Sequence, residues 1–221
     1  MPKIDIRQDL KALNNQKAAE NRDLFHSKRI YVINMMGSPG AGKTTLLESI
    51  LPKLNSVLNT AVIEGDLATQ NDALRIQNTG TIALQINTNG GCHLDAKMIE
   101  NQIQKLDLDT LQLLIIENVG NLVCPSTYDL GEDIRMVVLS LAEGEDKPVK
   151  YPVAFLNANT AVITKTDLAP YIDANADVMK KYITEINPKV LVFEAGKKDG
   201  VYSADKLAEY IIEQAKKKQS R

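Results

Sequence analysis

The sequence contains few cysteines, no excess of charge of either sign and no long apolar run. Two cysteines among 221 residues are too few for a disulfide framework, which favours a reducing compartment and predicts a cytoplasmic protein. The 26 lysines and arginines nearly balance the 28 aspartates and glutamates, so no overall field would attract nucleic acid or an acidic membrane. No apolar run approaches the roughly 20 residues of a membrane helix, and the first residues lack the apolar stretch of a signal peptide. We therefore expect a soluble chain with neither nucleic acid nor membrane as a partner.

The chain does contain a regular alternation of short apolar runs and helical segments. Runs rich in Val and Ile that alternate with helices predict an α/β protein, a mostly parallel sheet with helices on both faces. The seven predicted strands span residues 30–36, 61–64, 82–86, 112–118, 136–141, 161–164 and 190–193. The predicted helices span residues 43–54, 68–78, 94–106, 174–186 and 203–218. The polar residues 1–28 are expected to form an N-terminal helical extension, and residues 29–221, without linker or repeat, one domain.

A phosphate-binding pattern, G-x-x-x-x-G-K-[ST], lies between the first predicted strand and the helix that follows it. Its residues are Gly37, Ser38, Pro39, Gly40, Ala41, Gly42, Lys43 and Thr44. Glycines let backbone N–H groups surround a phosphate chain, and the helix N-terminus favours its negative charge. We expect Lys43 to reach the β- and γ-phosphates, Thr44 to ligate Mg²⁺ and Thr45 to belong to the same site. The pattern predicts a P-loop nucleotide-binding domain.

The segment Thr164-Lys165-Thr166-Asp167 follows a later strand and resembles the N-K-x-D base box of GTPases. A carboxylate only accepts hydrogen bonds, and guanine offers two adjacent donors, so Asp167 favours guanine over adenine. Lys165 is expected to lie along the plane of the base. Thr164 stands where the pattern usually has Asn. These residues predict GTP and GDP as ligands, whereas the phosphate loop alone would also suit an ATP-dependent small-molecule kinase.

Two acidic residues are candidates for the phosphate end of the nucleotide. Glu117-Asn118-Val119-Gly120 resembles the D-x-x-G switch of GTPases with Glu in place of Asp, and an acid there holds Mg²⁺ or its water. Asp66, in the segment E-G-D-L, is a further candidate for Mg²⁺ or for positioning the attacking water. We expect Lys43, Asp66 and Glu117 to carry catalysis. We find no analogue of a water-positioning Gln, which predicts slow intrinsic turnover.

Cys92, His93 and Cys124 form a candidate metal site. Adjacent ligands cannot share one face of a strand, so Cys92 and His93 need the loop that Gly90-Gly91 provides. Soft sulfur with imidazole suits Ni²⁺ or Zn²⁺, and a following helix is expected to favour the Cys92 thiolate. The alternative is that the cysteines are small buried hydrophobes. Three ligands leave the shell incomplete, so a GTP-dependent homodimer that joins two sets is expected.

Five segments together resemble the HypB family of hydrogenase nickel incorporation GTPases, over nearly all of residues 30–200. They are GSPGAGKTTLLE, EGDLATQNDALRI, TNGGCHLDA, IIENVGNLVCPSTYDLGE and ITKTDL. The resemblance implies a GTPase fold of the signal-recognition-particle-like class and a nucleotide-dependent dimer. It further implies delivery of nickel to a [NiFe] hydrogenase large-subunit precursor with a HypA-type companion. By position, it assigns metal binding to Cys92, His93 and Cys124, and nucleotide binding to the phosphate loop, Glu117, Lys165 and Asp167.

The sequence departs from the family pattern in two places. Residues 1–28 contain one His and no Cys, so we do not expect this segment to store nickel. Thr164 replaces the Asn of the base box, and Glu194-Ala195-Gly196-Lys197 stands where the family has S-A-K, with the Ala195 N–H still expected to face the base. The related urease accessory GTPase has a C-P-H triplet that this sequence lacks. A metal-binding module with a purely structural nucleotide is the third interpretation.

Overall fold

The computed structural model describes residues 6–66 and 71–220. Its centre is a sheet of seven parallel strands in the order β3-β2-β4-β1-β5-β6-β7. The strands are β1 (Tyr31–Gly37), β2 (Thr60–Asp66), β3 (Ile82–Asn87), β4 (Leu113–Glu117), β5 (Ile134–Ser140), β6 (Thr160–Thr164) and β7 (Leu191–Glu194). Every predicted strand is present within two residues of its expected ends, which confirms the mostly parallel sheet.

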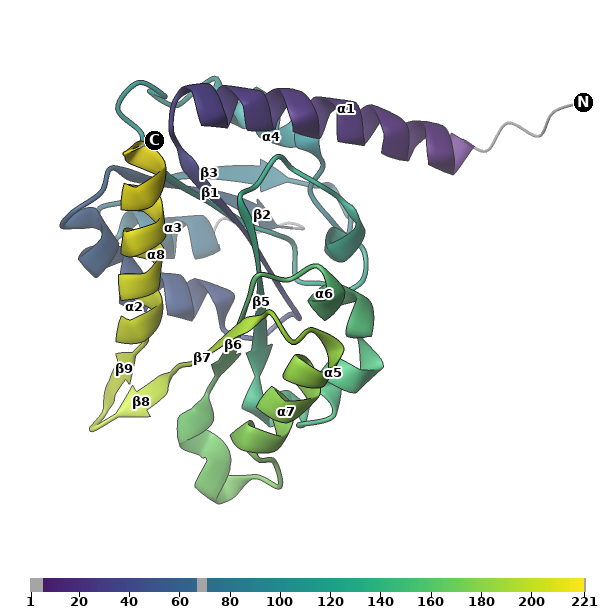
Figure 1. Cartoon of the computed structure of the whole chain (residues 1–221). Coiled ribbons are helices and arrows are strands. Elements are labelled where there is room, and N and C mark those ends of the chain that lie inside the picture. The colour runs from purple at the N-terminus through teal and green to yellow at the C-terminus, as the bar shows by residue number, and fades with distance from the viewer. Residues whose placement is uncertain (1–5, 67–70, 221) are drawn as a thin grey trace, which may run out of the picture.

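Helices cover both faces of this sheet (Figure 1). One face carries α2 (Lys43–Asn55), α3 (Asn71–Gln77) and α8 (Asp205–Gln219). The other carries α1 (Ile6–Ser27), α4 (Ala96–Ile103), α6 (Pro152–Leu156) and α7 (Ala176–Ile186), with the short α5 (Lys147–Lys150) packed on α7. Short 3₁₀ turns are η1 (Pro125–Thr127), η2 (Leu141–Glu143) and η3 (Thr166–Tyr171). The predicted helices are confirmed within three residues of their expected ends, except that residues 68–70 of one predicted helix lie outside the described residues.

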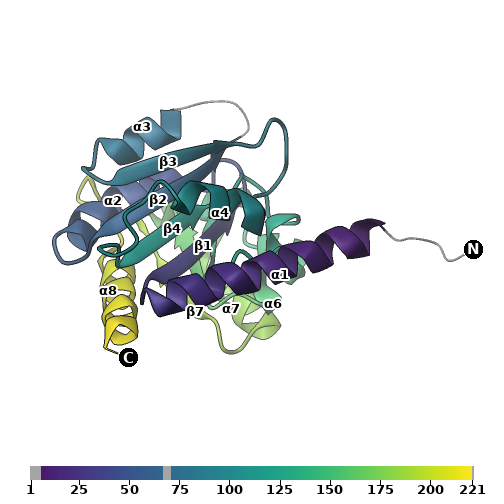
Figure 2. The same ribbon diagram turned by 90° about the horizontal axis from the view of Figure 1, so that it is seen from above.

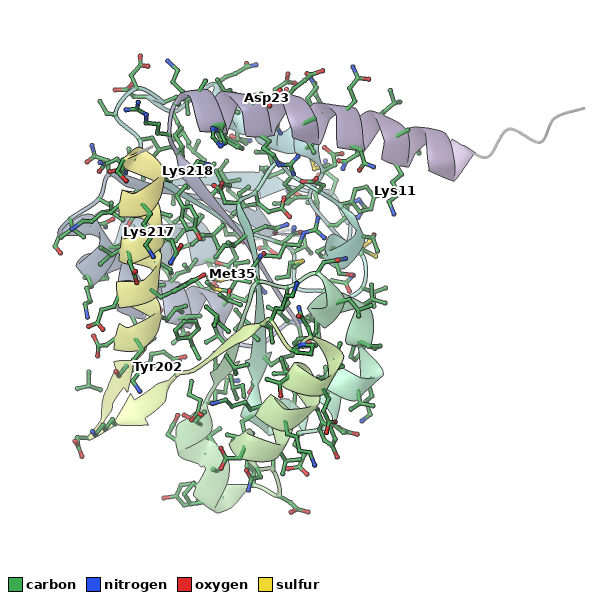
Figure 3. All side chains as sticks on the ribbon, in the orientation of Figure 1. Lys11, Asp23, Met35, Tyr202, Lys217 and Lys218 are labelled. Carbon is green, nitrogen blue, oxygen red and sulfur yellow. The ribbon has the colours of Figure 1, made fainter. Side chains whose placement is uncertain are left out.

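The central strand β1 is buried on both sides. Its successive side chains point to opposite faces of the sheet, and helices cover each face. Ile33 and Met35 pack in the core beneath α2 and α8, and Met35 lies at the centre of Figure 3. Val32 and Met36 point the other way, into the clusters beneath α1 and α4 and beneath α6 and α7. The fully buried Asn34 lies between these two side chains, a polar group on an apolar face.

The helix α1 is packed against the body along its second half and projects beyond it at its N-terminal end (Figure 2). Ala18 and Phe25 are fully buried. The buried side chain of Asn21 donates to the carbonyl oxygen of Ala96, at the start of α4, at 2.8 Å. Leu13, five residues before Ala18, keeps 63% of its surface exposed. The second half of α1 is therefore part of the packed structure.

A two-stranded hairpin between β7 and α8 was not among the predicted elements. Its antiparallel strands are β8 (Gly196–Lys198) and β9 (Val201–Ser203). Asp199 and Gly200 form the turn with φ values of 52° and 79°, as the tightest hairpin turns require. The dipeptide Asp-Gly is itself a hairpin signal that the strand pattern overlooked, because each strand has only three residues.

Lys218, near the end of α8, fastens that helix to the beginning of β5 (Figure 3). Its ammonium group donates to both carboxylate oxygens of Asp133, at 2.7 and 2.6 Å.

Within the described ranges no helix is long and apolar enough to cross a membrane.

Candidate functional site

A cavity of about 400 Å³ opens at the carboxyl ends of the central strands, which is where open parallel sheets bind ligands. It lies over β1, β2 and β4 and the first turn of α2. The predicted nucleotide and catalytic residues that line it are Pro39, Gly40, Gly42, Lys43, Thr44, Thr45, Asp66, Glu117 and Lys165. The structure thus brings together residues from segments more than 100 positions apart.

The phosphate loop has the backbone geometry that its glycines permit. Gly40 and Gly42 have φ values of 76° and 87°, in the left-handed region that side chains disfavour. A Cβ atom on Gly37 would lie 2.5 Å from the carbonyl oxygen of Val138. Gly42 is the N-cap of α2 and has no side chain to occupy the first N–H groups of the helix. Backbone donors at this helix start are therefore left for a ligand.

Gly37, Ser38 and Ala41 do not line the cavity but build the loop behind it. The N–H of Ala41 donates to the carbonyl oxygen of Ser38 at 3.1 Å, which closes the turn. Ala41 and Ser38 are both buried. These predicted residues contribute through the backbone.

Two buried carboxylates stand side by side at the floor of the cavity. Glu117 of β4 pairs in register with Glu64 of β2, and each is 3% exposed. The hydroxyl of Thr44 donates to Oε1 of Glu117 at 3.0 Å. Oε2 of Glu64 and Oε2 of Glu117 have no hydrogen-bond partner among the described residues. Buried oxygens of this kind fit a bound cation, because a buried acceptor without a donor is costly.

Burial controls the charge of this pair. It raises the pKa of Glu117 to about 7, and the positive charge of Lys43 opposes the rise. It raises the pKa of Glu64 to about 8, and the negative charges of Glu117 and Asp66 raise it further. A cation bound beside the carboxylates would lower both pKa values, since an opposite charge favours the ionised form.

Glu64 is a site residue that the sequence reasoning missed. It lies two positions before Asp66 on the same strand, so both side chains point to the same face. The sheet order then places it beside Glu117. The signal was available in the segment E-G-D, where two acids are spaced by two residues at the end of a strand.

Thr164, the departure from the base box, holds the phosphate loop in place. Its fully buried hydroxyl lies 2.6 Å from the carbonyl oxygen of Ala41 and 3.1 Å from that of Leu139. Lys165 has a φ of 57° and its ammonium group donates to the carbonyl oxygen of Gly40 at 2.8 Å. Both residues therefore join the end of β6 to the phosphate loop.

Asp167 and Ala195 lie beside the cavity and do not line it. Oδ1 of Asp167 accepts the N–H of Lys197 at 3.0 Å, which orients the carboxylate. The N–H of Ala195 donates to the carbonyl oxygen of Ile163 at 2.8 Å, and Ala195 is 2% exposed. The expectation that Ala195 offers this N–H to a base is therefore not met in this arrangement, because the extension of the sheet already uses it.

The side chains of Cys92, His93 and Cys124, hereafter the Cys–His–Cys cluster, come together at the surface near the cavity. One ligand atom from each lies within 4.8 Å of the others, and the Cys92 sulfur is 3.5 Å from Nδ1 of His93. Cys92 and His93 lie in the loop between β3 and α4, and Cys124 lies just before η1. Cys92 is exposed and Cys124 half-buried, which argues against the alternative that they are small core residues.

The protonation of the cluster differs from expectation at Cys92. A hydrogen bond with Cys124, together with burial, raises the pKa of the Cys92 thiol. The expected lowering by a helix start was wrong because Asp95, not Cys92, caps α4, accepting the N–H of Met98 at 2.8 Å. Burial lowers the pKa of His93, which favours the neutral imidazole that binds metals. The ring of Tyr128 lies on that of His93, with centroids 3.8 Å apart.

The chain is similar in sequence to known proteins. Residues 31–194 match the family model of the CobW/HypB/UreG nucleotide-binding domain. The chain is 46% identical over 187 residues to hydrogenase maturation factor HypB of Escherichia coli (strain K12), a match that covers 85% of this chain and 64% of that relative. The chain therefore spans slightly less than two thirds of that relative's length.

Solved structures extend the comparison to three dimensions. The crystal structure of HypB from Helicobacter pylori in complex with nickel is 38% identical, with a TM-score of 0.85 over 92% of this chain and 95% of that chain. Signal recognition particle 54 kDa protein from Aeropyrum pernix K1, in complex with GDP, is 12% identical, with a TM-score of 0.54 over 87% of this chain and 49% of that one, and shows the fold alone. The predicted P-loop fold, a mostly parallel sheet with helices on both faces, is confirmed. With the family model matching most of the chain, the protein belongs to the CobW/HypB/UreG family and, within it, to the HypB hydrogenase maturation factors.

Proposed function

We propose that this protein is a metal-regulated GTPase that binds nickel or zinc and couples GTP hydrolysis and dimerisation to nickel insertion into a [NiFe] hydrogenase large-subunit precursor. A HypA-type nickel metallochaperone is its proposed companion. One observation carries the proposal: the segment from Glu117 to Gly120 lines the nucleotide cavity, and the same segment leads to Cys124 of the Cys–His–Cys cluster four residues later. A rearrangement of this segment around a phosphate would move a metal ligand.

Phosphate binding rests on the phosphate loop and the residues at its end. The N-terminal N–H groups of α2 and the ammonium group of Lys43 face the γ-phosphate end of the nucleotide in this proposal, and offset charge during transfer. Thr44, Asp66 and Glu117 would hold Mg²⁺, and the unpartnered buried oxygen of Glu117 fits that role. When bound, Mg²⁺ supplies positive charge to the β- and γ-phosphates. Asp66 is also the proposed residue for orienting the attacking water.

Guanine selection is assigned to Asp167 and Lys165. The carboxylate of Asp167 is held by the N–H of Lys197 and would accept the two adjacent guanine donors, which adenine does not offer. The ammonium group of Lys165 donates to the carbonyl oxygen of Gly40, and in this proposal its stem lies along the plane of the base. This pairing supports GTP over ATP.

Metal binding is assigned to the Cys–His–Cys cluster. Two thiolates and a neutral imidazole form a donor set that suits Ni²⁺ and Zn²⁺. Three donors leave room for a further ligand, and a second copy related by two-fold symmetry would supply it. Because Cys92 is exposed, such a copy can approach the cluster without unfolding the loop.

The experiment that tests this function is a titration of nickel and of zinc into the full chain with GDP or with a GTP analogue, while the mass in solution is followed. We expect a dimer with the GTP analogue and a change in metal bound per chain between the two nucleotides. Cys124→Ala serves as the matched control, since it removes one donor from each cluster. A monomer in both states with the same metal content would contradict the proposal.

A further inference from the structure

Asn118, the residue after Glu117, fastens the loop that carries Cys92 and His93. Its side chain is 1% exposed. Its Oδ1 accepts two hydrogen bonds, one from the N–H of Leu94 at 3.1 Å and one from the N–H of Val119, the next residue, at 3.0 Å. Leu94 directly follows His93 in the sequence. One buried amide thus joins half of the Cys–His–Cys cluster to the strand end that enters the nucleotide cavity.

The same amide begins a chain of hydrogen bonds across the sheet. Nδ2 of Asn118 donates to Oδ1 of Asn34 at 3.2 Å, and Nδ2 of Asn34 donates to Oε1 of Glu132 at 3.4 Å. The same Glu132 oxygen accepts Nε–H of Arg135 at 2.7 Å. Asn34 is fully buried and pairs in register with Ile116 of β4 and with Arg135 of β5. These four residues, Asn118, Asn34, Glu132 and Arg135, are called the polar relay below.

The far end of the polar relay reaches the other half of the cluster. The Arg135 guanidinium donates to the carbonyl oxygen of Ser126 at 3.1 Å and to that of Tyr128 at 3.4 Å. Both residues follow Cys124 within four positions, and the Tyr128 ring lies on His93. The guanidinium therefore holds the segment that carries the third ligand.

The position of the polar relay argues for more than packing. Its central residue, Asn34, lies on a face of β1 where the adjacent same-face side chains, Val32 and Met36, are in apolar clusters. Apolar residues would fill this place without the cost of desolvating amides and a carboxylate. A fully satisfied buried network instead fixes the relative position of the groups that it joins.

We propose that Asn118 and Arg135 are positioning residues for the metal site, and that the polar relay sets the distance between the Cys92-His93 half and the Cys124 half of the cluster. The inference rests on the proposed function, in which the cluster binds nickel. It also provides a route from the end of β4, beside Glu117, to both metal-bearing loops.

The test measures Ni²⁺ binding to the full chain by competition with a chromophoric chelator and by the thiolate-to-nickel charge-transfer band. Arg135→Lys keeps a positive charge beside Glu132 but replaces the planar guanidinium, whose two terminal nitrogens donate to the two carbonyl oxygens, by a single nitrogen atom. Asn118→Ala removes both ends of the amide bridge. Asn187→Ala is the matched control, because its amide donates to the carbonyl oxygens of Phe155 and Ala158, both at 2.9 Å, away from the cluster.

We expect both relay variants to weaken Ni²⁺ binding about tenfold, as the loss of a group that supports metal ligands typically does, and to alter the charge-transfer band. Arg135→Lys should leave nucleotide affinity unchanged, because Arg135 does not line the cavity. Asn118→Ala should also speed hydrogen exchange at the Leu94 amide. Asn187→Ala should keep the Ni²⁺ affinity and spectrum of the unaltered protein whatever its thermal stability.

The outcomes separate this inference from the proposed function. Unaltered Ni²⁺ affinity and spectrum in Arg135→Lys and Asn118→Ala, with binding lost in Cys124→Ala, would overturn the role of the polar relay and leave the metal site standing. Equal weakening in Asn187→Ala would also overturn it, because general destabilisation would then explain the effect. Binding of Ni²⁺ that does not depend on Cys124 would overturn both. Should Asn118→Ala fail to fold, Arg135→Lys decides the matter alone.

Discussion

The nucleotide cavity and the Cys–His–Cys cluster lie close together but are built in opposite ways. The cavity rests on one contiguous loop and on strand ends, and Lys43, Thr44 and Glu117 are 8%, 6% and 3% exposed. The cluster is assembled from two surface loops, and Cys92 is exposed. A sheet holds the cavity in its binding geometry, whereas loop positions decide the geometry of the cluster. We therefore expect a change in nucleotide to alter the geometry of the cluster more than that of the cavity.

The largest expected effect separates the two sites through the phosphate loop. Lys43→Ala should lower nucleotide hydrolysis by about 10²–10³-fold, as the loss of one group that stabilises transferring phosphate charge does. Nickel affinity without nucleotide should stay the same. Steady-state phosphate release and chelator competition measure the two effects. Lys53→Ala, on the exposed side of the same helix and paired with Glu209 at 2.9 Å, is the control, and equal hydrolysis in both variants would contradict the assignment.

The reverse separation is expected from the cluster. Cys124→Ala should weaken nickel binding by about 100-fold, because one of three strong donors is lost. Nucleotide affinity without metal should not change, since the cavity geometry comes from the sheet. Isothermal titration with each ligand measures this. Val123→Ala, a neighbour that is 56% exposed, should match the unaltered protein, and a loss of nucleotide affinity in Cys124→Ala alone would show that the two sites are one structural unit.

The base site allows a finer test of the cavity. Asp167→Asn should weaken GTP binding about tenfold and favour xanthosine triphosphate, because an amide no longer accepts both guanine donors. Competition binding with the three triphosphates, including ATP, measures this preference. The exposed Asp173→Asn is the control. Undiminished GTP binding would count against guanine selection by Asp167, and equal ATP binding by the unaltered protein would favour the kinase interpretation.

The smallest effect concerns the buried carboxylates without nucleotide or divalent cation. Burial raises the pKa of Glu64 from about 4.5 to about 8. Between these values the folded protein binds more protons than the unfolded chain, so its free energy of unfolding falls as the pH rises from about 5 to 8. Glu64→Gln removes the part of this fall that Glu64 causes, so its stability relative to the unaltered protein should be higher at pH 8 than at pH 5.

Denaturant unfolding at pH 5 and pH 8 in the presence of a chelator measures this difference. Glu213→Gln, whose side chain is 61% exposed, should follow the unaltered protein at both pH values. A stability gain for Glu64→Gln that is as large at pH 5 as at pH 8 would mean that packing, and not charge, is the cause.

The sequence predicts those features that are formed by consecutive residues. Each central strand is an apolar run buried on both faces, and the phosphate loop is a single segment between a strand and a helix. Cys92, His93 and Cys124 could be named as a set because their side-chain chemistry is distinctive, although their spacing does not fix a geometry.

Other features depend on contacts across the sheet and were not predictable in the same way. Glu64 becomes a site residue only because β2 lies beside β4, and Thr164 holds the phosphate loop from 123 positions away. The N–H of Ala195 is taken by the carbonyl of Ile163 because β7 continues beside β6. The pKa of the Cys92 thiol is raised by a hydrogen bond with Cys124, which lies in another loop. Such effects require the strand order, which no local pattern contains.

The central claim, that the nucleotide governs the metal site, is tested most directly by the nickel dissociation constant of the full chain with GDP and with a non-hydrolysable GTP analogue. We predict that the two constants differ by about tenfold, and that nickel changes the ratio of the GDP and analogue affinities by the same factor, as linkage requires. Identical nickel dissociation constants in the two nucleotide states would contradict the account.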